Sequence, residues 1–112
     1  MSKIRDLLNL DCVYAAGEID TDGALRHFET SDGFVLPEVT AQAIAKAAHN
    51  ANGAMRDLAD DLQAATDVPW QPDHGWVFAG AAFSLAVCNG MGVFVDTHNS
   101  DFSAILRALA AL

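Results

Sequence analysis

Positively charged side chains are scarce in this chain, and their scarcity excludes several kinds of partner. The 112 residues include six Lys and Arg against fifteen Asp and Glu, which gives a net charge of −9. Nucleic-acid backbones and anionic membrane surfaces are both bound by clustered cations, and here the six cations are scattered along the sequence. We therefore expect no nucleic acid and no membrane as a partner, whereas a basic protein partner stays open.

Motifs that carry chemistry are also missing. The two thiols, Cys12 and Cys88, lie far apart in expected strands, so buried free thiols are favoured over a disulfide or a reactive thiolate. The four histidines show no Cys-x-x-Cys or His-x-x-x-His spacing, although Asp96-Thr-His98 and Asp73-His74 offer oxygen and nitrogen donors. Surface or capping histidines are therefore expected. We expect no metal, no cofactor and no catalytic residue, and hence no enzyme.

Long apolar runs and a secretory signal are lacking as well. The composition is 52% hydrophobic and 19% charged, which is far from that of disordered chains, and the apolar residues fall into short periodic runs. The first residues mix charges into the apolar positions and show no small-residue cleavage site. The sequence thus predicts one folded, cytoplasmic domain over residues 1–112.

Hydrophobic periodicity predicts the order of helices and strands. A short helix capped by Ser2 precedes a hairpin with strands at 12–20 and 25–30, and a long helix follows from about 37 to 65. Three strands then fall within 75–96, with Asn89-Gly90 as a hairpin turn, and Ser100-Asp101 begins a last helix. This order, α-β-β-α-β-β-β-α, predicts an α+β, profilin-like sandwich of three layers, with five antiparallel strands between helices.

The long helix has more surface than one sheet can cover. At about 40 Å it exceeds the width of five short strands, so its end or second face should meet something else. Its apolar seam consists of Ile44, Ala48, Ala51, Met55, Leu58, Leu62 and Ala65. A second face carries small residues, namely Ala43, Ala47, Gly53 and Ala54. Either helix propensity or a helix-to-helix contact explains the alanines, but Gly53 costs about 1 kcal/mol within a helix and favours contact.

Three further features of this region have competing interpretations. The polar patch at 49–53, which includes Asn50, either kinks the helix or forms hydrogen bonds across a dimer, and we favour the second. Asp57, Asp60 and Asp61 form either a solvated face or the acidic half of a partner-docking surface. Trp70 is expected to cover the edge of the core, whereas Trp76 is equally a core residue or an interface anchor.

Nearly the whole chain resembles a known family. The resemblance lies in the stretches 4–8 and 13–18, the Asp22-Gly23 turn, the pairs Trp70-Gln-Pro72 and Gly75-Trp76, and Gly92-Val-Phe-Val95. These features resemble the Roadblock/LC7-type domain and, within it, the small bacterial DUF2173 branch. The resemblance implies a homodimer in which the long helices pack across a two-fold axis and the third strands, near residues 76–80, join two sheets.

On this basis we expect a non-catalytic homodimeric adaptor. The expected interface consists of Ala43, Ala47, Asn50, Gly53, Ala54, Trp76 and Phe78. Domains of this kind regulate small GTPases or scaffold larger complexes, and the small branch resembles a component of heterodisulfide-reductase-like sulfur-oxidation systems. A small-GTPase regulator and a small-molecule sensor are the alternatives. A sensor would need a cavity lined by Phe83, Leu85 and Phe94, which we interpret as core residues instead.

Overall fold

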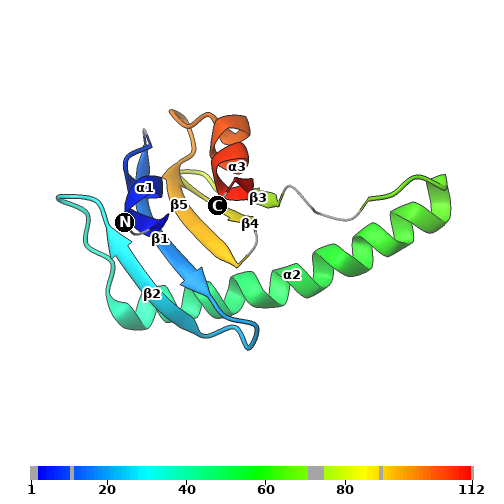
Figure 1. Ribbon diagram of the computed structural model, residues 1–112, viewed down its shortest axis with the longest axis horizontal. Coiled ribbons are helices and arrows are strands. Elements are labelled where there is room, and N and C mark those ends of the chain that lie inside the picture. Colours follow the sequence, from blue (N-terminus) through cyan, green and yellow to red (C-terminus); the bar gives the residue numbers. More distant parts are fainter. Residues whose placement is uncertain (1–2, 11, 71–74, 89, 112) are drawn as a thin grey trace.

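The predicted order of helices and strands is confirmed in a computed structural model that describes residues 3–10, 12–70, 75–88 and 90–111. Figure 1 shows the arrangement, and the bounds are α1 Lys3–Leu8, β1 Val13–Ile19, β2 Leu25–Thr30, α2 Glu38–Thr66, β3 Trp76–Ala79, β4 Phe83–Cys88, β5 Met91–Asp96 and α3 Phe102–Ala110. The α+β class expected from the sequence is therefore correct. The predicted cap Ser2 and the turn residue Asn89 lie outside the described residues.

The five strands form one antiparallel sheet in the order β2-β1-β5-β4-β3, so β2 and β3 are its two edges. Between β4 and its neighbours, Leu85 lies opposite Phe78 of β3 and Phe94 of β5. Residues opposite one another across antiparallel strands point to the same face of the sheet. These three apolar side chains therefore lie on the same face of the sheet, in a row across β5, β4 and β3.

Helices cover the two faces of the sheet to different extents (Figure 1). On one face α1 and α3 close the main core with the strands, and its buried members are Ile4, Leu7, Val13, Ala16, Ala86, Cys88, Met91, Val93, Val95, Ile105 and Leu109. On the other face lies α2, which contacts β1 and β2. The predicted three-layer sandwich is thus confirmed, with α2 as the third layer.

Local signals explain where the elements begin and end. The Asp101 carboxylate accepts the backbone N–H of Ala104 at 3.1 Å and so caps α3, as the sequence predicts. Asp67 adopts a left-handed conformation after α2 and donates its N–H to Gln63 O at 2.8 Å. Cys12 has φ of 66°, so β1 begins one residue later than predicted.

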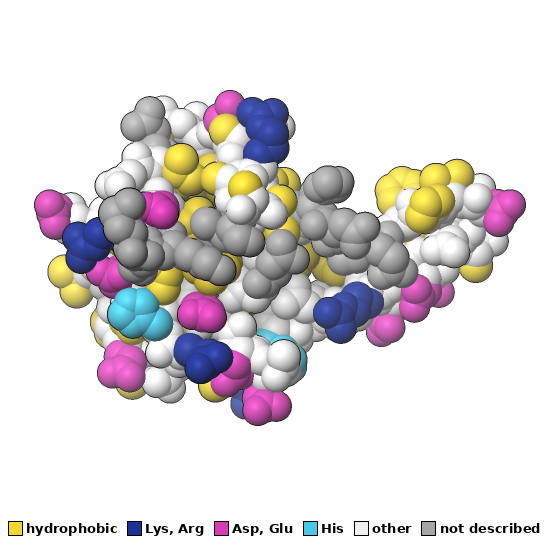
Figure 2. Space-filling model, in the orientation of Figure 1, with side chains coloured by type: hydrophobic (Ala, Val, Ile, Leu, Met, Phe, Trp, Pro, Cys, Tyr) yellow, Lys and Arg dark blue, Asp and Glu magenta, His cyan; other side chains and the backbone are white. Residues whose placement is uncertain are grey.

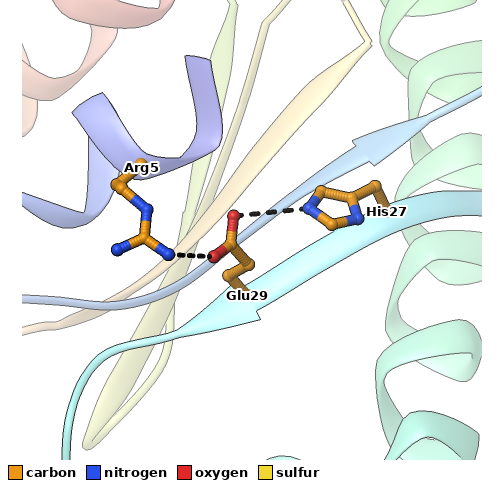
Figure 3. Close-up of polar contacts among 3 residues, drawn as sticks. All are labelled: Arg5, His27 and Glu29. Atoms are coloured by element: carbon orange, nitrogen blue, oxygen red, sulfur yellow. Dashed lines mark hydrogen bonds and ion pairs between the residues drawn. The ribbon is translucent and has the colours of Figure 1, made fainter. Parts of the chain in front are cut away.

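A polar contact holds α1 beside the edge strand β2 (Figure 3). Arg5 of α1 donates to Glu29 Oε1 at 3.1 Å, and His27 Nε2 lies 3.3 Å from Glu29 Oε2. Arg5 and His27 are largely exposed, and exposed ion pairs contribute only about 0–1 kcal/mol. The contact orients α1, while the buried Ile4 and Leu7 attach it to the core.

Candidate assembly surface

The two halves of α2 have different surroundings. The buried residues of the first half, Ala41, Ala45 and Ala48, pack toward the sheet, and their small side chains let the helix approach it closely. The second half continues past the sheet, as Figure 1 shows, and gives the molecule its longest dimension of 46 Å. The expectation that this helix outruns its own sheet is therefore correct.

A hydrogen bond marks the point where α2 leaves the sheet. The indole Nε1 of Trp76, the first residue of β3, donates to Asn52 Oδ1 at 2.6 Å. Asn52 lies near the middle of α2, and both side chains are partly buried. Part of the polar patch at 49–53 therefore binds within the chain, and one of the two tryptophans uses its N–H to attach the helix to the edge strand.

The face of small residues on α2 is open to solvent. Ala43, Ala47, Asn50, Gly53 and Ala54 are all exposed. At about 100° per residue, Ala43 and Asn50 point away from the buried side of the helix. No atom lies within 4 Å of a Cβ placed on Gly53, so nothing in the chain itself requires glycine there.

Apolar side chains are also exposed where the sheet ends at β3. Phe78 on this edge strand is 68% exposed and Phe83 on β4 is 42% exposed. The prediction that Phe83 is a core residue is wrong, because α2 covers the β1 and β2 side of this face and leaves β3 and β4 open. Leu85 and Phe94, the other two residues of that prediction, are half-buried.

The three acidic residues Asp57, Asp60 and Asp61 lie exposed on the second half of α2. They share this half with Arg56 alone among cationic residues, so the surface is acidic. In Figure 2 negative side chains gather on the lower side of the projecting helix. The projecting half of α2 thus presents a charged side to solvent.

The space between α2 and the sheet is small. An apolar cavity of about 50 Å³ lies there, lined by Leu85 and Phe94 from the sheet and by Ile44 and Ala45 from α2. Ligand pockets for metabolites or drugs usually measure about 300–1,000 Å³. The cavity has room for a few water molecules but not for a ligand of ordinary size.

A wider, open groove of about 680 Å³ runs between the β1–β2 turn and the outer side of α2. Ala43 and Asn50 line it together with Lys46, and Asp22 lies on the opposite wall. Val39, also in the lining, is 82% exposed. Two residues of the predicted dimer interface therefore face a groove of mixed charge and apolar character.

Aromatic rings stack along the rim of the open face. Phe83 stacks on Phe94 with centroids 4.9 Å apart, and Phe34 stacks on Tyr14 at 5.2 Å. Burial and the nearby Asp96 raise the pKa of Tyr14. The Asp96 carboxylate accepts the side-chain N–H of Asn99 and the backbone N–H of His98, and these bonds lower its pKa. Sequence periodicity gives no sign of this cluster because Phe34 comes from a loop.

The remaining candidates differ in their surroundings. Neither Cys12 nor Cys88 forms a disulfide. Cys88 is buried, as predicted, and burial raises its pKa, while Cys12 is half-buried and donates to Asn99 O at 3.4 Å. Trp70 is 47% exposed and donates to Thr66 Oγ1, so the prediction that it covers the core is wrong. The Asp73-His74 pair lies outside the described residues.

Two other kinds of site are absent from the parts of the chain that the structure describes. Within these ranges no three His, Cys, Asp or Glu side chains come together as a metal site. No described helix has the length and apolarity needed to cross a membrane. The candidate site of the described chain is therefore the surface formed by the residues predicted for assembly, which lie on α2 and β3.

The fold of the chain is the fold of Roadblock/LC7 domains. A Roadblock/LC7 domain from Streptomyces avermitilis aligns over 97% of this chain and 87% of its own, with 16% identity and a TM-score of 0.75. The gliding protein MglB from Thermus thermophilus aligns over 97% and 84%, with 16% identity and a TM-score of 0.72. A structure of MglB with a tetrameric arrangement aligns over 97% of this chain and 83% of its own, with 16% identity and a TM-score of 0.72.

The chain belongs to the DUF2173 family, described as an uncharacterized conserved protein, whose model matches residues 3–111. No curated protein matches the chain. The resemblance noted from the sequence is thereby confirmed at the level of both family and fold.

Proposed function

We propose that this protein is a non-catalytic, homodimeric adaptor that holds together a cytoplasmic multiprotein complex. One observation carries the proposal: Leu58 on the second half of α2 and Phe78 on the edge strand β3 are both more than half exposed. Unpaired edge strands and exposed apolar patches are surfaces that proteins usually cover with a partner.

The dimer is proposed to form through α2 and β3. Ala43, Ala47, Gly53 and Ala54 would let a second helix approach closely, with Asn50 supplying a hydrogen-bonding group at the seam. Trp76 and Phe78 would lie where two β3 strands pair. The exposure of the five helix residues and of Phe78 supports this assignment, since surfaces of this kind are available for a partner.

A further partner is proposed to dock on Asp57, Asp60 and Asp61. Charge complementarity mainly sets partner choice and association rate, so a basic surface is the expected counterpart. We propose a heterodisulfide-reductase-like sulfur-oxidation system as the setting, on the resemblance to the DUF2173 branch. Regulation of a small GTPase is the alternative. A small-molecule sensor that binds between the sheet and α2 is not favoured, because the cavity there has a volume of only about 50 Å³.

The test begins with the oligomeric state. Light scattering at micromolar concentration should give twice the mass of the chain, and the double variant Ala47→Glu, Phe78→Asp should give the mass of one. A wild-type protein that stays monomeric would refute the dimer.

The docking surface is tested by capture from the native host's soluble extract. Wild-type protein, the dimer-breaking variant and a triple variant with Asn at 57, 60 and 61 are each immobilised, and the retained proteins are identified by mass spectrometry. A complex held by the wild type and lost with the triple variant supports an acidic docking surface. Equal retention by both would assign docking elsewhere on the molecule.

A further inference from the structure

The open groove between the β1–β2 turn and the outer side of α2 has the size of a ligand site. Its volume is about 680 Å³, and ligand pockets usually measure about 300–1,000 Å³. The helix wall carries Val39, Lys46 and Asn50 among others, and the opposite wall is formed by the turn. The groove therefore has room for a small molecule without any opening of the core.

The residues of the helix wall recur with helical spacing. Val39, Lys46 and Asn50 are seven and four residues apart, so they lie on one side of α2, the side that faces the turn. Ala47 and Ala54 of the proposed dimer interface lie about 80–100° around the helix from Lys46 and do not line the groove. A single chain thus builds the groove, on a side of the helix next to the proposed interface.

A glycine shapes the wall formed by the turn. Gly23 has φ of 87°, and a Cβ there would lie 2.8 Å from Cγ of His49, so the missing side chain lets the imidazole lie against the turn. The turn is held by the Asp20 carboxylate, which accepts the backbone N–H groups of Asp22 and Ala24 at 2.9 and 3.0 Å. Both walls are therefore formed before a ligand binds, which lowers the cost of binding.

The groove has an apolar end and a polar end. At the first end Val39 is 82% exposed, and Ala43 follows one helical turn further along. At the second end Lys46, His49 and Asn50 supply an ammonium, an imidazole and an amide, about 10–16 Å from Val39 along the helix axis. An elongated molecule with one apolar end and one polar end matches this division.

The charges favour a ligand with a single negative charge. Among the described residues, no carboxylate lies within 4 Å of the Lys46 ammonium, so its charge is available to a ligand. Glu38, by contrast, already places a carboxylate in the first turn of α2, where it accepts the Gln42 side chain at 3.2 Å. Asp22 in the lining and the net charge of −9 oppose a multiply charged phosphate. A carboxylate has one charge and accepts several hydrogen bonds, which suits an ammonium with an amide beside it.

We propose that this groove binds a small carboxylic acid with an apolar body. The carboxylate lies at Lys46 and Asn50, and the apolar body extends along Ala43 toward Val39. Because one chain forms the whole site, this inference goes beyond the proposed adaptor and does not depend on the dimer. An adaptor with this site has a metabolite-binding surface beside its assembly surface.

Nuclear magnetic resonance with 4-phenylbutyrate as the probe tests the site. A fragment of this size is expected to bind with a dissociation constant on the order of 1 mM, which a chemical-shift titration of ¹⁵N-labelled protein measures well. Saturable shifts should be confined to residues 22–25 and 39–50, which line the groove. Shifts that do not saturate, or that gather at Phe78 and Phe83 instead, would overturn the proposal.

A matched pair of variants and a matched ligand test the role of the charge. Lys46→Gln removes the cation from the groove, and Arg56→Gln makes the same change in charge on the same helix outside the lining. Affinity for the probe should fall roughly three- to tenfold with Lys46→Gln and stay unchanged with Arg56→Gln. The uncharged 4-phenylbutanol should bind the wild type more weakly than the acid does. Equal affinity for acid and alcohol, or equal effects of the two variants, would refute recognition of a carboxylate.

A monomeric variant separates this inference from the proposed function. The double variant Ala47→Glu, Phe78→Asp should bind the probe about as tightly as the wild type, because neither residue lines the groove. Saturable binding by a wild-type protein that is itself monomeric would keep the groove and refute the dimer. Loss of binding in the double variant, with its helix content kept in circular dichroism, would place the site between two copies and contradict a groove formed by one chain.

Discussion

The two faces of the sheet are built from equally apolar strands but are covered to different extents. On the face of α1 and α3, Leu109 and Val95 have no exposed surface. On the face of α2, Phe78 and Phe83 retain 68% and 42% of theirs. The open part of the second face is not explained by a lack of helix to cover it. The helix α2 is 29 residues long, but its second half continues past the edge of the sheet instead of lying over β4 and β3. The difference leaves an apolar surface open on the second face of the sheet, where the proposed assembly would have to form.

The largest expected effect contrasts one residue from each face. Leu109→Ala should lower the free energy of unfolding by about 2–5 kcal/mol, because it leaves a cavity in a fully packed region. Phe78→Ala should change it by less than about 0.5 kcal/mol at concentrations where the protein is monomeric. Urea denaturation measures both. A large loss from Phe78→Ala in the monomer would mean that the open face contributes to the fold of a single chain.

Two glycines, one packed against the first half of α2 and one at the start of its second half, are expected to respond to substitution in opposite directions. Gly23 has φ of 87°, and a Cβ there would lie 2.8 Å from the His49 ring of the covered half. Gly23→Ala should therefore destabilise the protein by about 1–3 kcal/mol. Gly53 begins the half that projects past the sheet and has open space around it, so Gly53→Ala should stabilise the monomer by up to about 1 kcal/mol.

Thermal unfolding of both glycine variants gives the sign of each effect. If Gly53→Ala stabilises the monomer yet weakens the dimer, close helix approach at this position is supported. Destabilisation of the monomer by Gly53→Ala would contradict the open surroundings of this residue.

A substitution at the point where α2 leaves the sheet is expected to have a moderate effect on stability. Asn52→Ala leaves the indole N–H of Trp76 without its partner, which should cost about 1–2 kcal/mol. Asn50→Ala, two residues earlier and exposed, is the matched control and should change stability by less than about 0.5 kcal/mol. Chemical denaturation followed by tryptophan fluorescence reports the result. Equal effects from the two variants would show that the bond does not hold the helix.

The smallest effect concerns the pH dependence of the open face. Hydrogen bonds from Asn99 and from the His98 backbone lower the pKa of Asp96 in the folded protein. A lowered pKa contributes stability that is present above the unfolded value of about 3.9 and is lost as pH falls through the folded value. Melting temperature should therefore drop less between pH 5 and pH 2 in Asp96→Asn than in the wild type. If the melting temperatures of the two proteins fell equally between pH 5 and pH 2, Asp96 would not contribute to the pH dependence of stability.

The sequence is sufficient for the order of elements because their signals are local. The Asp101 cap, the hairpin of the strands at 12–20 and 25–30 and the helical periodicity from about 37 to 65 are each local patterns, and each is predicted correctly. The exposure of Phe83 is predicted wrongly, because it depends on where α2 crosses the sheet. Such a crossing is set by packing between distant segments, which periodicity does not record.

The candidate site can be predicted only in part for the same reason. The small residues on α2 stand out by their spacing, and the structure leaves them exposed. The bond between Asn52 and Trp76 joins residues 24 positions apart and needs the tertiary structure to bring them together. Its only trace in the sequence is a polar patch within a helix, where asparagine is uncommon.

The attachment of α2 near its middle gives the helix a mechanical property. A helix of 29 residues is a stiff rod about 43 Å long, and the Trp76 indole holds it close to its centre at Asn52. The first half of this rod is fixed along its length, because Ala41, Ala45 and Ala48 are buried against the sheet. The second half therefore projects like a beam fixed at one end, and a load on its far tip near Thr66 bears on the sheet edge at Asn52.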